Sequence, residues 1–236
     1  MEKTSKTLGV LGGIGPMSTV YFYELLTSLT RADSDQEHLD IVISSRASTP
    51  DRTAYIVGKS TENPLDAMIP DAKRLAAFGA DVIAIPCNTA HYFYDRLAES
   101  VDVPILNIIE EAVAHLTARG VTKFGLLATD GTVESGTYQK YCASRGIECV
   151  IPDGAHQRRV MSIIYDQIKS GRDADMESFF DIAHDMREKG CERLILGCTE
   201  LSLIKKNAKL GDFYVDPLHC LALSSIRACG KKTIFD

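Results

Sequence analysis

The sequence predicts an α/β protein built from two similar halves, each with a largely parallel sheet flanked by helices. Short apolar stretches rich in β-branched residues alternate with longer stretches that have helical periodicity. The order of these stretches in the first half returns in the second half. Because parallel strands need a crossover that usually contains a helix, this alternation favours parallel sheets covered on both faces.

In the first half, strands are expected at residues 7–11, 40–44, 81–86 and 103–107. Helices are expected at residues 16–30 and 64–78, from a corner at Cys87 to about residue 100, and at 110–119. Pro16 suits the first turn of a helix, and Gly79 suits a C-cap. Residues 46–60 are polar and long for a loop in a compact α/β unit, which favours a functional role.

The second half repeats this pattern. Strands are expected at residues 123–129, 146–151, 193–197 and 213–217, and helices at 133–144, 155–170, 173–189 and 218–228. Gly190 would end the third of these helices. We expect residues 1–111 together with 216–236 to form one domain and residues 112–215 to form the other.

One strand in each half ends at a cysteine. The two motifs are Ile85-Pro86-Cys87-Asn88-Thr89-Ala90-His91 and Leu196-Gly197-Cys198-Thr199-Glu200-Leu201. Because α/β folds place ligands at the carboxyl ends of parallel strands, we expect Cys87 and Cys198 to flank one cleft between the domains.

Composition and charge exclude several classes of function. The chain has 45% hydrophobic and 25% charged residues, as expected of a globular protein. A net charge of -6 without a cluster of basic residues argues against a nucleic-acid groove or an anionic membrane surface. No apolar run reaches the length of a membrane span, and no signal region follows the polar N-terminus. We therefore expect a cytoplasmic protein with a small-molecule partner.

The cysteine pattern predicts free thiols. There are seven cysteines, an odd number, and none forms a CxxC motif. Five lie inside stretches expected to be helical or extended, where cysteine acts as a small apolar residue: Cys142, Cys149, Cys191, Cys220 and Cys229.

The glycine-rich turn at residues 12–16 only superficially resembles a dinucleotide-binding fingerprint. Its glycines do not have the G-x-G-x-x-G spacing. No acidic residue stands at the end of the strand at residues 40–44, where a ribose hydroxyl would be bound. A nucleotide site is therefore not predicted.

The two corners suit thiol chemistry on an anionic substrate. The positive end of the following helix favours a thiolate and lowers the pKa of a cysteine there. The side chains of Asn88, Thr89 and Thr199 could cap these helices or bind a ligand oxygen, and free backbone N–H groups would suit a carboxylate.

Three kinds of chemistry are compatible with the two cysteine corners. One cysteine could be a covalent nucleophile, with His91 as the only local candidate for a general base. Two opposed thiols could instead act as acid and base on the two faces of one carbon. A Cys/His metal site is weakly supported because neither corner has enough closely spaced ligands.

Five segments, in this order and with comparable spacing, carry a resemblance over nearly the whole chain. They are Leu11-Gly12-Gly13-Ile14-Gly15-Pro16, Pro50-Asp51-Arg52-Thr53-Ala54-Tyr55, Pro86-Cys87-Asn88-Thr89-Ala90-His91, Leu127-Ala128-Thr129 and Gly197-Cys198-Thr199-Glu200. With these segments the sequence resembles the PLP-independent aspartate/glutamate racemase family, and is most similar to its aspartate racemases. The resemblance implies two α/β domains, each with a four-stranded parallel sheet, an active site in the interdomain cleft, and a homodimer.

The resemblance also implies racemisation of a dicarboxylic amino acid without a cofactor or metal. Cys87 and Cys198 would be the acid/base pair, with roles that exchange when the hand of the substrate changes. Arg52 would bind the side-chain carboxylate in bidentate geometry, assisted by Lys169.

The remaining residues of the expected substrate-binding set come from the same resemblance. They are Asn88, Thr89 and Thr199 on the α-carboxylate, together with Thr129 and Glu200.

Several of these residues also have a purely structural interpretation. Arg52 would be a solvated loop arginine, Lys169 would complement a helix dipole, and Thr129 and Glu200 would cap helices. The role of Arg46, an additional cation just before the Pro-Asp-Arg segment, is open.

Alternative functions are racemisation of glutamate, cis-trans isomerisation of maleate with covalent attack by one cysteine, and binding of acidic metabolites without catalysis. Aspartate and glutamate differ by one methylene, which a pocket discriminates by only about 1–3 kcal/mol.

Overall fold

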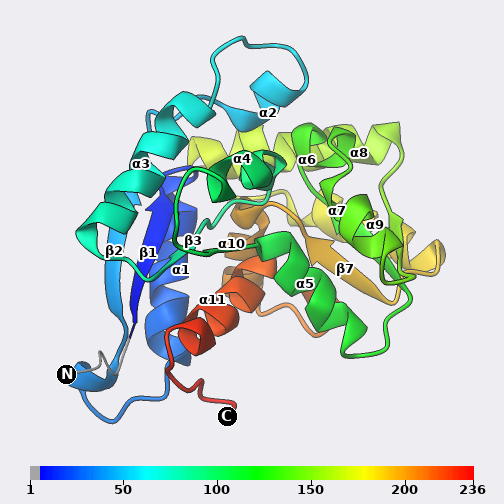
Figure 1. Cartoon of the computed structure of the whole chain (residues 1–236). Coiled ribbons are helices and arrows are strands. Elements are labelled where there is room, and N and C mark those ends of the chain that lie inside the picture. Colours follow the sequence, from blue (N-terminus) through cyan, green and yellow to red (C-terminus); the bar gives the residue numbers. More distant parts are fainter. Residues whose placement is uncertain (1–5) are drawn as a thin grey trace.

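The computed structural model describes residues 6–236, and its strands form two parallel sheets. The strands are β1 (Thr7–Gly12), β2 (Asp40–Ser45), β3 (Val82–Ala84), β4 (Ile105–Leu106), β5 (Lys123–Leu127), β6 (Glu148–Val150), β7 (Arg193–Leu196) and β8 (Tyr214–Val215). The strand order is β2-β1-β3-β4 in the first sheet and β6-β5-β7-β8 in the second (Figure 1). All pairings between these strands are parallel. The predicted fold of two equivalent α/β halves is therefore confirmed.

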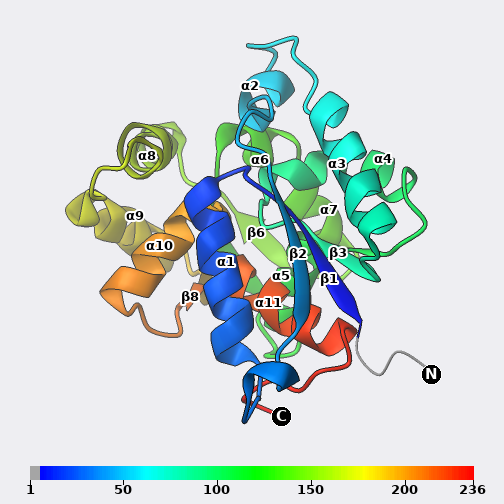
Figure 2. The same cartoon turned by 90° about the vertical axis from the view of Figure 1, so that its left-hand side faces the viewer.

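Helices cover both sheets (Figures 1 and 2). The α-helices are α1 (Pro16–Leu29), α2 (Arg52–Ile56), α3 (Leu65–Phe78), α4 (Tyr94–Ala98), α5 (Ile108–Thr117), α6 (Asp130–Glu134), α7 (Thr137–Ala143), α8 (Gly154–Met161), α9 (Met176–Glu188), α10 (Thr199–Ala208) and α11 (Pro217–Ala228). The described residues also form four segments of other helix types: η1 (Asp35–Glu37), η2 (Thr89–Phe93), η3 (Ser162–Gln167) and η4 (Ile168–Ser170), of which η3 is a π-helix. Within residues 6–236, no helix combines the length and apolar character needed to cross a membrane.

A continuous apolar core lies between the two sheets. Val10 of β1, Phe124 of β5 and Leu221 of α11 all belong to it and are fully buried. Separate cores cover the outer faces, with Ile83 in that of the first sheet and Leu194 in that of the second. Helix α11 packs against both α1 and α5 within the central layer (Figure 1). The two halves are thus joined through buried side chains, while the domain boundaries at residues 111 and 215 remain a prediction.

Two segments of the first half differ from the expected elements. The stretch 46–60 is not entirely loop, because α2 forms in it with Asp51 as N-cap; the Asp51 carboxylate accepts a hydrogen bond from the Ala54 N–H at 2.7 Å. The helix expected after Cys87 is a 3-10 turn, η2, followed by the short α4.

Two segments of the second half also differ. The helix expected at residues 133–144 is divided into α6 and α7 by Gly136, which has a φ of 63°, a backbone conformation that favours glycine. The helix expected at residues 155–170 is α8 continued by the π-helix and a 3-10 turn. A π-helical segment inside a helix often marks a functional site.

Each sheet has a point at which successive connections run in opposite directions. The central strand β1 has β2 on one side and β3 on the other, and β5 lies in the same way between β6 and β7. Ligands in open α/β sheets bind at such points, outside the carboxyl ends of the strands. Cys87 follows β3 and Cys198 follows β7, so both cysteines occupy this position.

His91 fixes the shape of the corner after β3. Its Nδ1 lies 2.8 Å from the carbonyl oxygen of Cys87, and its Nε2 lies 3.2 Å from the backbone nitrogen of Ile108. The Ile108 N–H donates to Nε2, so the ring proton belongs on Nδ1 and donates to Cys87. Burial lowers the pKa of His91 to about 4, against partial compensation by its backbone hydrogen bonds. His91 is therefore a neutral structural residue.

We predict that the free energy of unfolding falls as pH decreases from about 6.5 to about 4, because the unfolded chain then binds a proton at residue 91 that the folded chain excludes. The full effect of this one residue is about 3 kcal/mol. Nitrogen-15 NMR of the imidazole should show a neutral ring from pH 8 to pH 5.

The pKa values of His115 and His219 are also lowered, so both contribute to the pH dependence of stability. Urea unfolding of the wild type and of His91→Gln at several pH values therefore gives the contribution of His91 as the difference between the two proteins. The variant should show the shallower pH dependence. A His91 ring that titrates near pH 6.5 would contradict the assignment.

Candidate functional site

The two cysteine corners meet at one small cavity between the sheets. Seven of the nine residues expected to form the site line it: Arg52, Cys87, Thr89, Thr129, Lys169, Cys198 and Glu200. Asn88 and Thr199 are buried beside the two cysteines but do not line it. The free space is about 10 Å³, roughly enough for one water molecule.

A second, larger cavity adjoins the first and opens outward. It has a volume of about 420 Å³ and shares Arg52, Lys169 and Glu200 with the inner cavity. The glycine-rich turn after β1 forms one wall. A ligand that reaches the cysteines through this outer cavity therefore passes the two cationic side chains.

The glycines of that turn are required by close packing. Gly13 has a φ of 79°, and a Cβ at this position would overlap the backbone of Arg46. A Cβ on Gly15 would lie 2.9 Å from Oε1 of Glu200. The turn therefore makes room for β2 on one side and for the Glu200 carboxylate on the other.

Cys198 lies at the start of α10 and belongs to a chain of three polar side chains. Its Sγ donates a hydrogen bond to Oε2 of Glu200 at 2.9 Å. The other oxygen, Oε1, accepts a hydrogen bond from Nζ of Lys169 at 2.6 Å. Glu200 is buried, whereas the Lys169 side chain is 26% exposed toward the outer cavity.

This arrangement keeps the proton on Cys198. Burial raises the pKa of the Cys198 thiol well above its ordinary value, and the Glu200 carboxylate raises it further; the Lys169 ammonium offsets only part of this. Burial would also lower the pKa of Lys169, but Glu200 and Cys198 raise it by more. The expectation that the helix terminus lowers the pKa is thus wrong for Cys198, because burial and a neighbouring carboxylate outweigh the helix dipole.

The Cys87 corner has no comparable carboxylate. Thr89, the residue two positions after Cys87, instead joins a network of buried hydroxyl groups. Its Oγ1 lies 3.0 Å from that of Thr129 and 2.9 Å from that of Thr132, and Thr53 of α2 donates to Thr129 at 3.0 Å. The network joins α2 of the first half to the start of α6 in the second.

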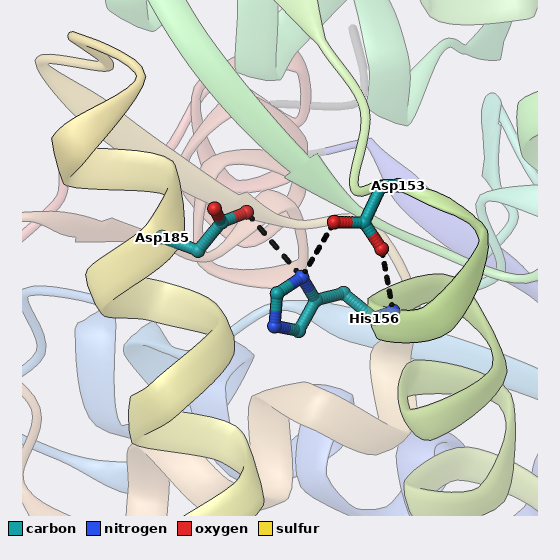
Figure 3. Close-up of side chains that lie close together, drawn as sticks. All are labelled: Asp153, His156 and Asp185. Atoms are coloured by element: carbon teal, nitrogen blue, oxygen red, sulfur yellow. Dashed lines mark hydrogen bonds and ion pairs between the residues drawn. The ribbon is translucent and has the colours of Figure 1, made fainter.

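Neither a general base at His91 nor a Cys/His metal site accounts for the Cys87 corner. Both ring nitrogens of His91 face backbone groups, so the ring is not placed as a general base for the Cys87 thiol. Within residues 6–236, the one group of three potential ligand atoms close enough to hold a metal is that of Asp153, His156 and Asp185 (Figure 3). None of these three residues lines the cysteine cavity.

The Asp153 group is accounted for by packing between α8 and α9. Asp153 caps α8 by accepting hydrogen bonds from two backbone N–H groups, and Nδ1 of His156 lies 3.0 Å from Asp153 and 3.5 Å from Asp185. Asp185 also pairs with Lys189 at 2.7 Å. The cluster therefore ties two helices together.

Two polar atoms near the cysteines are buried without a hydrogen-bond partner among residues 6–236. These are Nδ2 of Asn88 and Nε of Arg52. The other amide atom of Asn88, Oδ1, accepts a hydrogen bond from the Tyr138 hydroxyl at 2.7 Å. Because an unpaired buried donor costs free energy, both atoms are candidates to bind a ligand oxygen.

Arg52 and Arg46 have different environments. Nη1 of Arg52 donates to the carbonyls of Pro50 and Thr49 at 2.9 and 3.3 Å, which holds the guanidinium over both cavities. Arg46 instead lies 3.4 Å from Asp71 and lines neither cavity. Its side chain is thus directed away from the site.

Sequence reasoning missed Thr53 and Tyr165, which also line the inner cavity. The Tyr165 hydroxyl donates to Asp51 at 3.0 Å and so connects the π-helix to the cap of α2. Nζ of Lys169 lies 5.4 Å from the centre of the Tyr165 ring. The four-residue spacing of Tyr165 and Lys169 was a signal for a shared face, and Thr53 adjoins Arg52 in sequence.

Several known racemases resemble this chain in sequence and in fold. A broad-specificity amino-acid racemase from Bacillus subtilis is 27% identical over 230 residues, which covers 93% of this chain and 96% of that protein. The structure of Picrophilus torridus aspartate racemase matches with a TM-score of 0.85 and 32% identity, covering 97% of this chain and 96% of that one. An aspartate racemase homologue from Pyrococcus horikoshii matches with a TM-score of 0.78 and 28% identity, covering 95% and 99%.

The family model that matches this chain is that of Asp/Glu/hydantoin racemases, and the match extends over residues 11–224. The chain therefore belongs to the Asp/Glu/hydantoin racemase family.

Proposed function

We propose that this protein interconverts L- and D-aspartate without a cofactor, by proton transfer between Cα and two cysteines. The observation that carries the proposal is that Cys87 and Cys198, at equivalent points of the two sheets, line the same buried cavity as Arg52. The similarity to aspartate racemases over nearly the whole chain supports the choice of substrate.

In the proposed mechanism the two cysteines have different resting roles. Cys198 holds its proton and acts first as the donor, so Cys87 is the base that removes the Cα proton in that direction. The electron pair left on Cα delocalises into the carboxylate, and Cys198 then delivers its proton to the opposite face of Cα. Cys87 then carries a proton and Cys198 a negative charge, which is the starting state for the opposite enantiomer.

Lys169 and Glu200 make this exchange of roles possible. After proton donation the Cys198 thiolate lies beside the Glu200 carboxylate, and two adjacent negative charges repel each other. The Lys169 ammonium, 2.6 Å from Glu200, compensates one of them. The three side chains therefore carry a net charge of zero before proton donation and −1 after it, whereas without Lys169 the charge would change from −1 to −2.

Substrate binding follows from the available donors. Arg52 offers a guanidinium at the junction of the two cavities, where it can bind the side-chain carboxylate. Thr89 and Thr129 provide hydroxyl groups near the cysteines, and Nδ2 of Asn88 is an unused buried donor beside them. Donors directed at the α-carboxylate stabilise the charge that develops when Cα loses its proton.

Replacement of either cysteine tests the two-base mechanism. Cys87→Ser and Cys198→Ser should each lower kcat for racemisation by about 10²–10⁴-fold or more, because each removes one acid/base group. Chiral chromatography measures racemisation, and proton NMR in heavy water measures exchange at Cα. Cys191→Ser, at a buried cysteine outside the cavity, is the control.

Full activity in either site variant would exclude the mechanism. A substrate adduct on one cysteine, detected by mass spectrometry, would favour covalent isomerisation of the maleate type instead. Tight binding of aspartate by the wild type without exchange at Cα would indicate a binding protein.

Glu200→Gln tests which group keeps Cys198 protonated. Removal of the carboxylate should lower the pKa of Cys198, since one of the causes that raise it is lost and Lys169 remains. Cys198 should then react faster with a small thiol reagent near neutral pH, while racemisation slows. Peptide mapping by mass spectrometry measures the modification of each cysteine.

Glu99→Gln, an exposed position, is the matched control and should leave the reactivity of Cys198 unchanged. Slower modification of Cys198 in Glu200→Gln would show that the carboxylate does not control its protonation.

Arg52→Lys tests the choice of an acidic substrate. Lysine keeps the charge but loses the bidentate fork, so KM for aspartate should rise about 10- to 100-fold, as expected for the loss of a charged hydrogen bond. The matched control is Arg46→Lys, in the same segment but outside both cavities. Kinetics on D- and L-aspartate, glutamate and alanine measure the effect.

Racemisation of alanine that equals that of aspartate in the wild type would contradict the role of Arg52. A higher kcat/KM for glutamate would retain the mechanism and change the substrate. The homodimer remains a prediction that sedimentation would test.

A further inference from the structure

A separate cavity lined by several basic side chains lies outside the cysteine cavity. It is a cavity of about 350 Å³ that shares no lining residue with the inner or outer cavity described above. It lies near the end of α5, the start of β7, α10 and the start of α11; α11 contacts α5 and α10, and α10 contacts β7 (Figure 1). Five of its lining side chains are basic: His115, Arg119, Arg193, Lys205 and His219.

Among the residues that the structure describes, the three permanent cations of this cavity have no ion-pair partner. Within residues 6–236, no carboxylate oxygen lies within 4.0 Å of the charged nitrogens of Arg119, Arg193 or Lys205. Arg119 donates to His115, Arg193 to the carbonyl of Glu192 and Lys205 to the carbonyl of Tyr214. These neutral acceptors orient the side chains without cancelling their charge.

The two acidic residues of the cavity compensate only part of the positive charge. Asp216 is buried, and its Oδ1 already accepts hydrogen bonds from the Ser202 hydroxyl and the Leu218 N–H. Burial raises the pKa of this carboxyl. Asp212 is exposed at the edge of the cavity. The cavity lining thus carries three permanent cations and two carboxylates. Outside the lining, hydrogen bonds from Thr122 and, less strongly, the charge of Arg193 lower the pKa of Glu192.

The neighbouring histidine experiences this excess of positive charge. Burial and then the charges of Arg119, His219, Lys205 and Arg193 lower the pKa of His115 to about 4. The neutral imidazole remains able to donate or accept a hydrogen bond. The cavity therefore combines three fixed charges on three elements with neutral polar groups between them.

We propose that this cavity binds a multivalent oxyanion, such as the phosphate or polycarboxylate group of a metabolite. Guanidinium forks match the oxygen geometry of both groups, and a polyvalent anion can contact cations on three separate elements at once. A single-atom anion such as chloride could not contact cations on three separate elements at once. The site is independent of the racemase activity, because none of its residues belongs to the proposed catalytic or substrate-binding set.

Isothermal titration calorimetry tests whether this cavity binds an oxyanion. Pyrophosphate and citrate are titrated separately, and sodium chloride at equal ionic strength serves as the reference. The wild type should bind at least one of the two anions at one site per chain. The double variant Arg119→Gln/Arg193→Gln should bind at least tenfold more weakly. Arg96→Gln/Lys140→Gln removes the same net charge from exposed positions elsewhere and should bind as the wild type does.

A second readout does not depend on any variant. Addition of the bound anion should shift the imidazole resonances of His115 and leave those of His91 unchanged, because His115 lines this cavity and His91 does not. Comparison of pyrophosphate with citrate identifies the preferred oxyanion.

Three results would overturn the proposal. They are equal binding by both double variants, anion binding no tighter than that of chloride, and dissociation of an oligomer only in Arg119→Gln/Arg193→Gln. The last would show that an acidic side chain of a second copy occupies the cavity.

Discussion

The packing of both sheets on one shared apolar core is the constraint on which the site depends. Fully buried side chains of β1, β5 and α11, such as Val10, Phe124 and Leu221, belong to the same cluster. Because this cluster is continuous, the two sheets cannot shift far relative to each other without exposing it to water. The carboxyl ends of β3 and β7 are therefore held so that Cys87 and Cys198 line one cavity.

Within this nearly symmetric frame, the surroundings of the two cysteines differ in charge. The residue two positions after each cysteine is Thr89 in one half and Glu200 in the other. The hydroxyl of Thr89 joins a neutral network, whereas Glu200 accepts hydrogen bonds from Cys198 and Lys169. The repeated fold supplies two thiols, and burial together with the Glu200 carboxylate raises the pKa of Cys198.

The sequence was sufficient for the fold and for most of the cavity, since strand ends, caps and glycine turns are local features. It was insufficient where distant segments meet. The protonation of Cys198 depends on burial and on Glu200, which the local rule for helix termini does not include. Likewise, the π-helix that carries Tyr165 has no simple periodic signature, so its contact with Asp51 could not be predicted.

The inner cavity is too small for the proposed substrate, so part of the molecule has to move when the substrate binds. A space for about one water molecule cannot hold an amino acid between the cysteines. Rotation of the halves would disturb the shared core, whereas α2 is a five-residue helix with a smaller set of contacts. Thr53 joins the hydroxyl network, and the N-cap Asp51 accepts a hydrogen bond from Tyr165. Tyr55 packs against Phe93. Gly131 allows α2 to lie directly on α6, since a Cβ there would be 2.9 Å from the Cα of Thr53. Because moving one short helix breaks fewer buried contacts than separating the two sheets, we expect α2 to move as substrate enters, carrying Arg52 with it.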